Sequence, residues 1–230
     1  MLRGQRVEYT LERKRVKNVN LRVKPEGLFV SAPPSVPAAK VDEFLVRNAD
    51  SILRMAQRQS SRVNVSPAAM ELTDGGRVPL LGRAVPLRVL QGTKNSVTLA
   101  DGVLVVTVKD PADGELCRRV TEKWLREECI ALVTARCRAL YALFPAERVP
   151  WPELKFRLMR SRWGSCQPRE GIVTFNTALI SVPPECIDYV VVHELCHFFH
   201  ADHSPAFWAE VEKRLPDHRA RRKALRQYGL

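Results

Sequence analysis

Four of the five histidines in this 230-residue chain lie close together, between residues 193 and 203. Two of them belong to a His-Glu-x-x-His sequence formed by His193, Glu194 and His197. This pattern is typical of a helical zinc site that carries its own general base. Side chains four residues apart share a face of a helix, so His193 and His197 can bind one ion. Glu194 is one position further round and can reach a water on that ion without joining its inner shell.

A zinc site of this type needs a third protein ligand, and the spacing favours His203. Residue 200 lies about 10.5 Å along a helix from His193, which is too far for His200 to share an ion with it. The helix must therefore end and the chain return. Residues 201–203 allow this, and a second helix can begin with Ser204 as N-cap and Pro205 in its first turn. The alternative third ligands are Glu210, Glu212 and His200.

A surface histidine cluster on an ordinary amphipathic helix would be a simpler explanation. The apolar run at residues 187–192 argues against it, because this run places the first histidine on a buried helix. Cys196 lies inside the motif but on another face of the helix, which favours a small buried packing residue over a ligand.

One Zn²⁺ per chain on three neutral imidazoles would keep its charge and an open position for water, whose pKa it could lower to about 7. Glu194 would accept the water proton and pass it to the leaving group. A donor for the developing oxyanion is missing from the motif, and Arg162 and Tyr189 are the candidates. Arg162 could instead pack on Trp163, and Tyr189 could be a core residue. Asp202 could steady a ligand imidazole or only shape the turn.

The composition is that of a globular protein, with 45% hydrophobic and 27% charged residues. The net charge of +12 favours polyanionic partners or acidic substrates, although it equally aids solubility. Neither a membrane-spanning apolar run nor the apolar core of a signal peptide is present, which predicts a cytoplasmic protein without membrane contact. The six cysteines form no Cys-x-x-Cys pair and are expected to be free thiols.

The elements that position the histidines fall into two predicted regions. Residues 1–110 are expected to be β-rich and basic, with one helix over about residues 37–58. Strands are predicted there at residues 7–13, 20–24, 28–32, 78–81, 85–90, 96–99 and 103–109. A polar stretch at residues 59–67 is the best candidate for a linker.

Residues 111–230 are expected to form the metal-binding domain. The apolar spacing predicts helices over residues 114–143, from residue 184 through the histidine motif, and over 205–214, with strands at 155–159 and 171–176. Basic residues in the first strands and after Pro216 could form a polyanion or nucleic-acid surface. A solvated face is the better interpretation, because no aromatic residues interleave with the basic ones of the tail.

Several segments resemble the YgjP-like metallopeptidase family, and together they cover nearly the whole chain: residues 21–27, 81–83, 162–166, 175–176, 187–197 and 203–208. The resemblance implies kinship with SprT-like and WLM zinc peptidases. It assigns the metal ligands to His193, His197 and His203 and the base to Glu194. It also implies that an edge strand near the metal helix, for which residues 171–176 are the candidate, pairs with an extended substrate. Relatives commonly have a Trp in the first helix, where this chain has Asp50-Ser51-Ile52.

The sequence thus predicts an α+β protein with a β-rich region at 1–110 and a zincin-like (minigluzincin or SprT-like) domain at 111–230. We expect a zinc-dependent hydrolase, a metallopeptidase acting on peptides or proteins. A metal-dependent hydrolase of nucleotides or phosphoanhydrides is one alternative, favoured by the positive charge but lacking a Gly-rich phosphate loop. A nucleic-acid-associated protein with a SprT-like protease site is the other.

Overall fold

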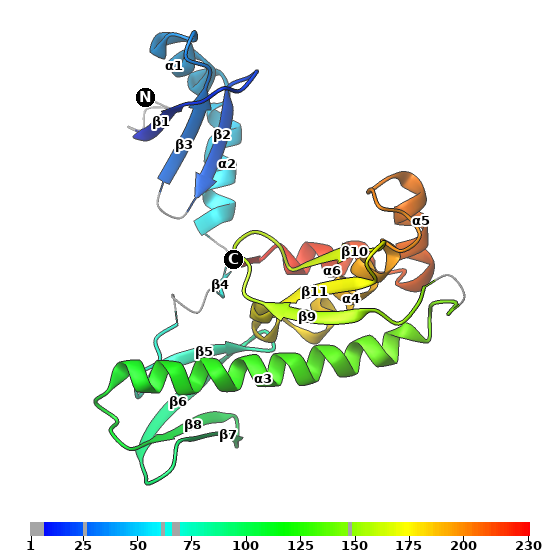
Figure 1. The fold of residues 1–230 in the computed structure, drawn as a ribbon. Coiled ribbons are helices and arrows are strands. Elements are labelled where there is room, and N and C mark those ends of the chain that lie inside the picture. The colour runs from blue at the N-terminus through cyan, green and yellow to red at the C-terminus, as the bar shows by residue number, and fades with distance from the viewer. Residues whose placement is uncertain (1–6, 25–26, 61–62, 66–69, 147–148) are drawn as a thin grey trace. The chain divides into compact units, whose positions relative to one another are not determined.

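The computed structural model describes residues 7–24, 27–60, 63–65, 70–146 and 149–230 (Figure 1). The chain divides into two compact units, Met1–Arg62 and Val63–Leu230. The division falls in the polar stretch at residues 59–67, and the predicted boundary after residue 110 lies inside the second unit. Helices and strands are both abundant, and the fold is α+β.

The first unit is a small sheet with two helices. Its strands are β1 (Tyr9–Arg13), β3 (Gly27–Ala32) and β2 (Asn20–Lys24), in that order, with β1 parallel and β2 antiparallel to β3. Alternate residues of β3 are buried, as expected for a strand with one face on a core. This core is completed by helices α1 (Ala38–Arg47) and α2 (Ala49–Ser60).

The single helix predicted over about residues 37–58 is wrong, because the structure has two helices there. The break is at Asn48, whose backbone leaves helical geometry (φ −101°, ψ 14°). The Asn48 side-chain amide donates to the Phe44 carbonyl oxygen at 2.8 Å, a local bond of the type that competes with helix propagation. The apolar spacing continues across the break and therefore does not reveal it.

The second unit begins with a four-stranded sheet in the order β5 (Arg77–Leu80), β6 (Arg83–Gln91), β8 (Val103–Val108) and β7 (Ser96–Ala100). The predicted strands of this region are confirmed. The buried face of β8, with Leu104 and Val106, shares one core with the long helix α3 (Gly114–Tyr141). Because α3 covers the apolar face of these strands, they belong to the second unit and not to the first.

A second sheet carries the candidate site. Its order is β10 (Gly164–Gln167), β11 (Ile172–Asn176) and β9 (Glu153–Arg157), with β11 antiparallel to β10 and parallel to β9. The expectation that residues 171–176 form the edge strand beside the substrate is therefore corrected: β11 is paired on both sides. The edge strand beside the helix that carries the histidine motif, α4 (Pro184–Cys196), is β10, which the sequence did not predict.

The remaining elements follow β11 in the chain. The 3-10 helix η2 (Thr177–Ser181) leads to α4 (Pro184–Cys196), α5 (Pro205–Arg214) and α6 (His218–Leu225). The short strands β4 (Val63–Asn64) and β12 (Tyr228–Gly229) pair in parallel. No helix within the described ranges has the length and apolarity needed to cross a membrane.

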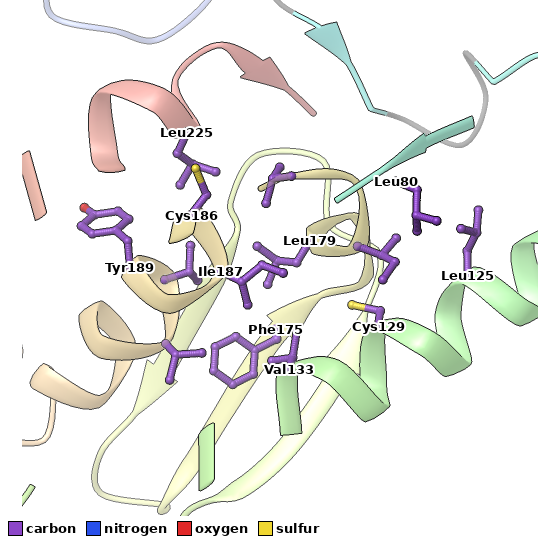
Figure 2. Packing of buried hydrophobic residues seen from close by; sticks show 14 of the residues in the cluster. Leu80, Leu125, Cys129, Val133, Phe175, Leu179, Cys186, Ile187, Tyr189 and Leu225 are labelled. Atoms are coloured by element: carbon purple, nitrogen blue, oxygen red, sulfur yellow. The ribbon is translucent and has the colours of Figure 1, made fainter. Parts of the chain in front are cut away.

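The core of the second unit surrounds α4 (Figure 2). Phe175 of β11, Val133 of α3 and Ile187 of α4 are completely buried and lie together there. Truncating Phe175 to alanine would cost about 3–5 kcal/mol. Polar contacts tie the same helices together: the Asp188 carboxylate accepts from Arg136 at 2.6 and 2.7 Å.

All six cysteines are free thiols, as predicted. Five are buried, and burial raises the pKa of Cys129, Cys137 and Cys196 to about 12. They therefore act as small apolar packing residues. Cys196 is among them, in agreement with the packing role expected for it.

Candidate metal centre

The first two histidines are positioned by α4. The helix begins at Pro184, with Glu185 in its first turn, and buries an unbroken run of residues from Cys186 to Val192. His193 follows this run and is half-buried, and the helix ends at Cys196 with His197 as its C-cap. The burial that anchors α4 in the core therefore fixes the position of the motif at its end.

The third histidine is positioned by the start of α5. Ser204 is the N-cap, its hydroxyl accepting from Phe207 N at 3.4 Å, and Pro205 is the first helical residue, as the sequence predicts. Asp202 Oδ1 accepts from Ser204 N at 3.2 Å. Asp202 thus shapes the turn that returns the chain to α4, and His203 lies at the end of this turn.

The three imidazoles of His193, His197 and His203 converge. The Nε2 atoms of His193 and His203 are 3.0 Å apart, and one nitrogen from each of the three rings lies within 4.8 Å of the others. The ring of Phe207 packs against all three, at 4.6 to 5.0 Å between centroids. Two consecutive helices and one aromatic side chain therefore hold the cluster.

The alternative third ligands lie elsewhere. The backbone oxygen of His200 faces His197 Nδ1 at 3.1 Å, but the His200 side chain is not part of the cluster. Glu210 forms an ion pair with Arg214, and Glu212 lies 3.7 Å from Arg219. The geometry groups only His203 with the two motif histidines among the described residues.

The donors suit a transition metal. Burial lowers the pKa of His193 to about 3, so this ring is neutral and has a free lone pair. The His200 carbonyl beside His197 Nδ1 favours the tautomer in which Nδ1 carries the proton and Nε2 is free to bind. Two nitrogens 3.0 Å apart can both bind an ion at about 2.0–2.1 Å. An all-imidazole set fits zinc, and also copper, iron or nickel.

Glu194 is almost completely buried, with 5% of its surface exposed, beside β10. Burial raises the pKa of its carboxyl to about 8, and the nearby positive charge of Arg162 opposes this shift. A Cβ atom at position 164 would lie 2.6 Å from Glu194 Oε1, so any side chain at this position would force Glu194 to move. The carboxylate and β10 are thus in direct contact.

The loop between β9 and β10 is held by one side chain that sequence reasoning missed, Asn176. This amide is fully buried and donates to the carbonyl oxygens of Met159 and Arg162 at 2.8 and 2.9 Å. It also accepts from the backbone N–H groups of Met159 and Ala178. Asn176 is the N-cap of η2, a position at which Asn is common. Asn176 therefore fixes the loop before β10, which contains Arg162 and leads to Gly164 beside Glu194.

The two oxyanion candidates lie in different surroundings. Arg162 is exposed, and its charge acts on Glu194. Tyr189 is 5% exposed, and its ring centre is 5.7 Å from that of His193, so Tyr189 is a buried residue that packs beside this histidine. Two tryptophans lie nearby: Trp163 packs against the core, and Trp208 lies 5.8 Å from His203, ring centre to ring centre.

A family model described as YgjP-like, metallopeptidase domain, matches residues 17–228. Among solved structures, the metallopeptidase zymogen abylysin of Pyrococcus abyssi is similar, with 21% identity and a TM-score of 0.32 over 44% of this chain and 98% of its own. Comparison with curated proteins gives no match.

Proposed function

Since this chain belongs to the YgjP-like metallopeptidase family, we propose that it hydrolyses peptide bonds at a zinc ion held by His193, His197 and His203. The family supports a metal-dependent peptidase. We further propose that the metal is zinc, that the three histidines bind it, that Glu194 is the base and that the arrangement is zincin-like. The observation that carries it is the convergence of three imidazoles, from the end of α4 and from the turn before α5, next to a buried glutamate.

Glu194 and His200 would each have a defined role in this reaction. A bound zinc ion would supply a Lewis acid for the scissile carbonyl and would make water more acidic. Glu194 would accept a proton from the attacking water and deliver it to the leaving amine. A nearby cation favours the ionised carboxylate and so opposes the effect of burial on Glu194. The His200 carbonyl would keep His197 in the binding tautomer.

The substrate would bind as an extended strand along β10. In the described part of the chain, β10 is paired with β11 on one side only, and it lies against α4. Backbone hydrogen bonds to a free strand edge give affinity with little dependence on sequence. The contact between Gly164 and Glu194 would bring a chain on this edge close to the base.

The test uses purified full-length protein loaded with zinc. Wild type should contain about one zinc per chain and cleave a casein-like substrate. Glu194→Gln should keep the metal and lose about 10²–10⁴-fold in kcat, the range expected for removal of a general base. A Glu194→Gln variant with the kcat of wild type would refute the role of Glu194. Hydrolysis of nucleoside triphosphates, with no cleavage of peptides, would overturn the proposed substrate class.

A further inference from the structure

Two arginines from different elements lie near the candidate site, and the proposed chemistry uses neither. Arg222 lies close to the histidine cluster, and Arg162 lies on the loop that leads to Gly164 beside Glu194. The first is Arg222 of α6. Its guanidinium carbon lies 4.7 Å from the ring centre of Trp208. The same tryptophan ring lies 5.8 Å from the ring centres of both His193 and His203. Trp208 thus packs against both the exposed Arg222 guanidinium and two of the candidate metal ligands, His193 and His203.

The second is Arg162, on the loop before β10. Its carbonyl oxygen is bound by Asn176, so the backbone at this position is fixed. It lies two residues before Gly164, which touches Glu194. The Arg162 side chain itself is exposed. A fixed backbone with an exposed cationic side chain is suited to contacting a ligand on β10.

In the part of the chain that the structure describes, neither of these arginines is in an ion pair with a carboxylate. Other arginines of α5 and α6 have carboxylate partners: Arg214 with Glu210, Arg219 with Glu212, and Arg221 with Asp188 and Asp217. Of the two carboxylates near the cluster, Asp202 accepts a hydrogen bond from Ser204 N, and Glu194 lies against Gly164.

From this imbalance we propose that the site selects peptides with acidic side chains flanking the scissile bond, which Arg162 and Arg222 bind. The proposal rests on the proposed peptidase function. Arginine pairs with carboxylates through its planar fork of donors, so Asp or Glu side chains are the fitting partners. Complementary charge at the rim of a site raises association rates and discriminates against like-charged ligands.

The first experiment compares three fluorogenic peptides that differ only beside the cleavable bond, with Glu, Gln or Lys at the flanking positions. Zinc-loaded wild type should give a kcat/KM about tenfold higher for the Glu peptide than for the Gln peptide, and lowest for the Lys peptide. The preference should shrink between roughly 0.05 and 0.5 M NaCl, because salt screens exposed charges. Equal rates for the Glu and Gln peptides would overturn the proposal.

Variants then assign the preference to the two side chains. Arg162→Met and Arg222→Met should each lower the ratio between the Glu and Gln peptides, and the double variant should bring it close to one. Arg222→Lys, which keeps the charge, should retain most of the preference. Lys123→Met on α3, whose partner is Glu127, is the matched control and should leave the ratio unchanged. A double variant with the wild-type ratio would also overturn the assignment.

Binding separates this proposal from the peptidase function itself. Fluorescence anisotropy with Glu194→Gln protein measures peptide affinity without turnover. Tighter binding of the Glu peptide by about tenfold supports the charge selection even if no peptide is cleaved. In that case the proposed function fails and the selection stands. Equal binding of the three peptides contradicts the selection whether or not wild type cleaves them.

Discussion

At the residue scale, the proposed metal centre depends most on one side chain outside the helical motif, His203. His203→Ala removes one of three nitrogens, so zinc affinity should fall by at least about 100-fold, beyond the loss typical of a supporting residue. Metal analysis after dialysis against a weak chelator measures this. His200→Ala is the matched control, because His200 contacts His197 through its backbone oxygen, which the substitution keeps. Loss of zinc from His200→Ala with retention in His203→Ala would reverse the two roles.

The distinction between His200 and His203 could be made from the sequence because it rests on local geometry alone. A rise of about 1.5 Å per residue places His200 too far along a helix from His193 for both to bind one ion, and the Ser-Pro signal marks where the next helix begins. Gly164 and Asn176 could not be found in this way. Their roles depend on contacts with residues far away in the chain, Glu194 for the first and the loop before β10 for the second.

At the element scale, the spacing between β10 and α4 constrains the position of Glu194, the proposed base. In Gly164→Ala the added Cβ would lie 2.6 to 2.8 Å from three atoms of the Glu194 side chain. The carboxylate must move, and a displacement of about 1 Å can cost about 100-fold in rate. We expect a fall of about that size in kcat with unchanged zinc content, since the histidines lie on α4 and at the start of α5.

Gly114→Ala is the matched control for this substitution. Gly114 is the first residue of α3, and a Cβ there meets no atom within 4 Å. Its kcat should equal that of wild type. Full activity of Gly164→Ala would show that the contact between β10 and Glu194 does not constrain the base.

The helices of the site were more predictable than its strands. α4 and α5 begin with Pro and Ser-Pro signals and follow regular apolar spacing, so their bounds could be read from residues 184–214. β10 has the sequence Gly-Ser-Cys-Gln, with no β-branched or aromatic residue, and forms a strand only because β11 pairs with it. Such tertiary effects are not visible in a local pattern.

At the scale of the whole molecule, the two units have separate hydrophobic cores. The core of the first unit draws on residues 28–52, and that of the second on residues 70–225. The sequence placed the boundary after residue 110, where strand-rich composition changes to helical. Composition indicates whether a segment forms a helix or a strand, but it does not indicate which element that segment packs against. Because α3 packs on the strands that precede it, the change in composition after residue 110 is not a boundary between units.

Separate cores predict two unfolding transitions, of which zinc should shift only one. All three candidate ligands lie in the unit Val63–Leu230, and an ion that binds only the folded state stabilises it by about 2.7 kcal/mol at 100 times its Kd. For a unit of this size the midpoint should rise by roughly 5 to 10 °C. Scanning calorimetry of the full chain with and without zinc measures both transitions. His203→Ala should show a much smaller shift, because weaker binding stabilises less at the same zinc concentration. A zinc-dependent shift of both transitions, or one transition for the whole chain, would contradict the independence of the units.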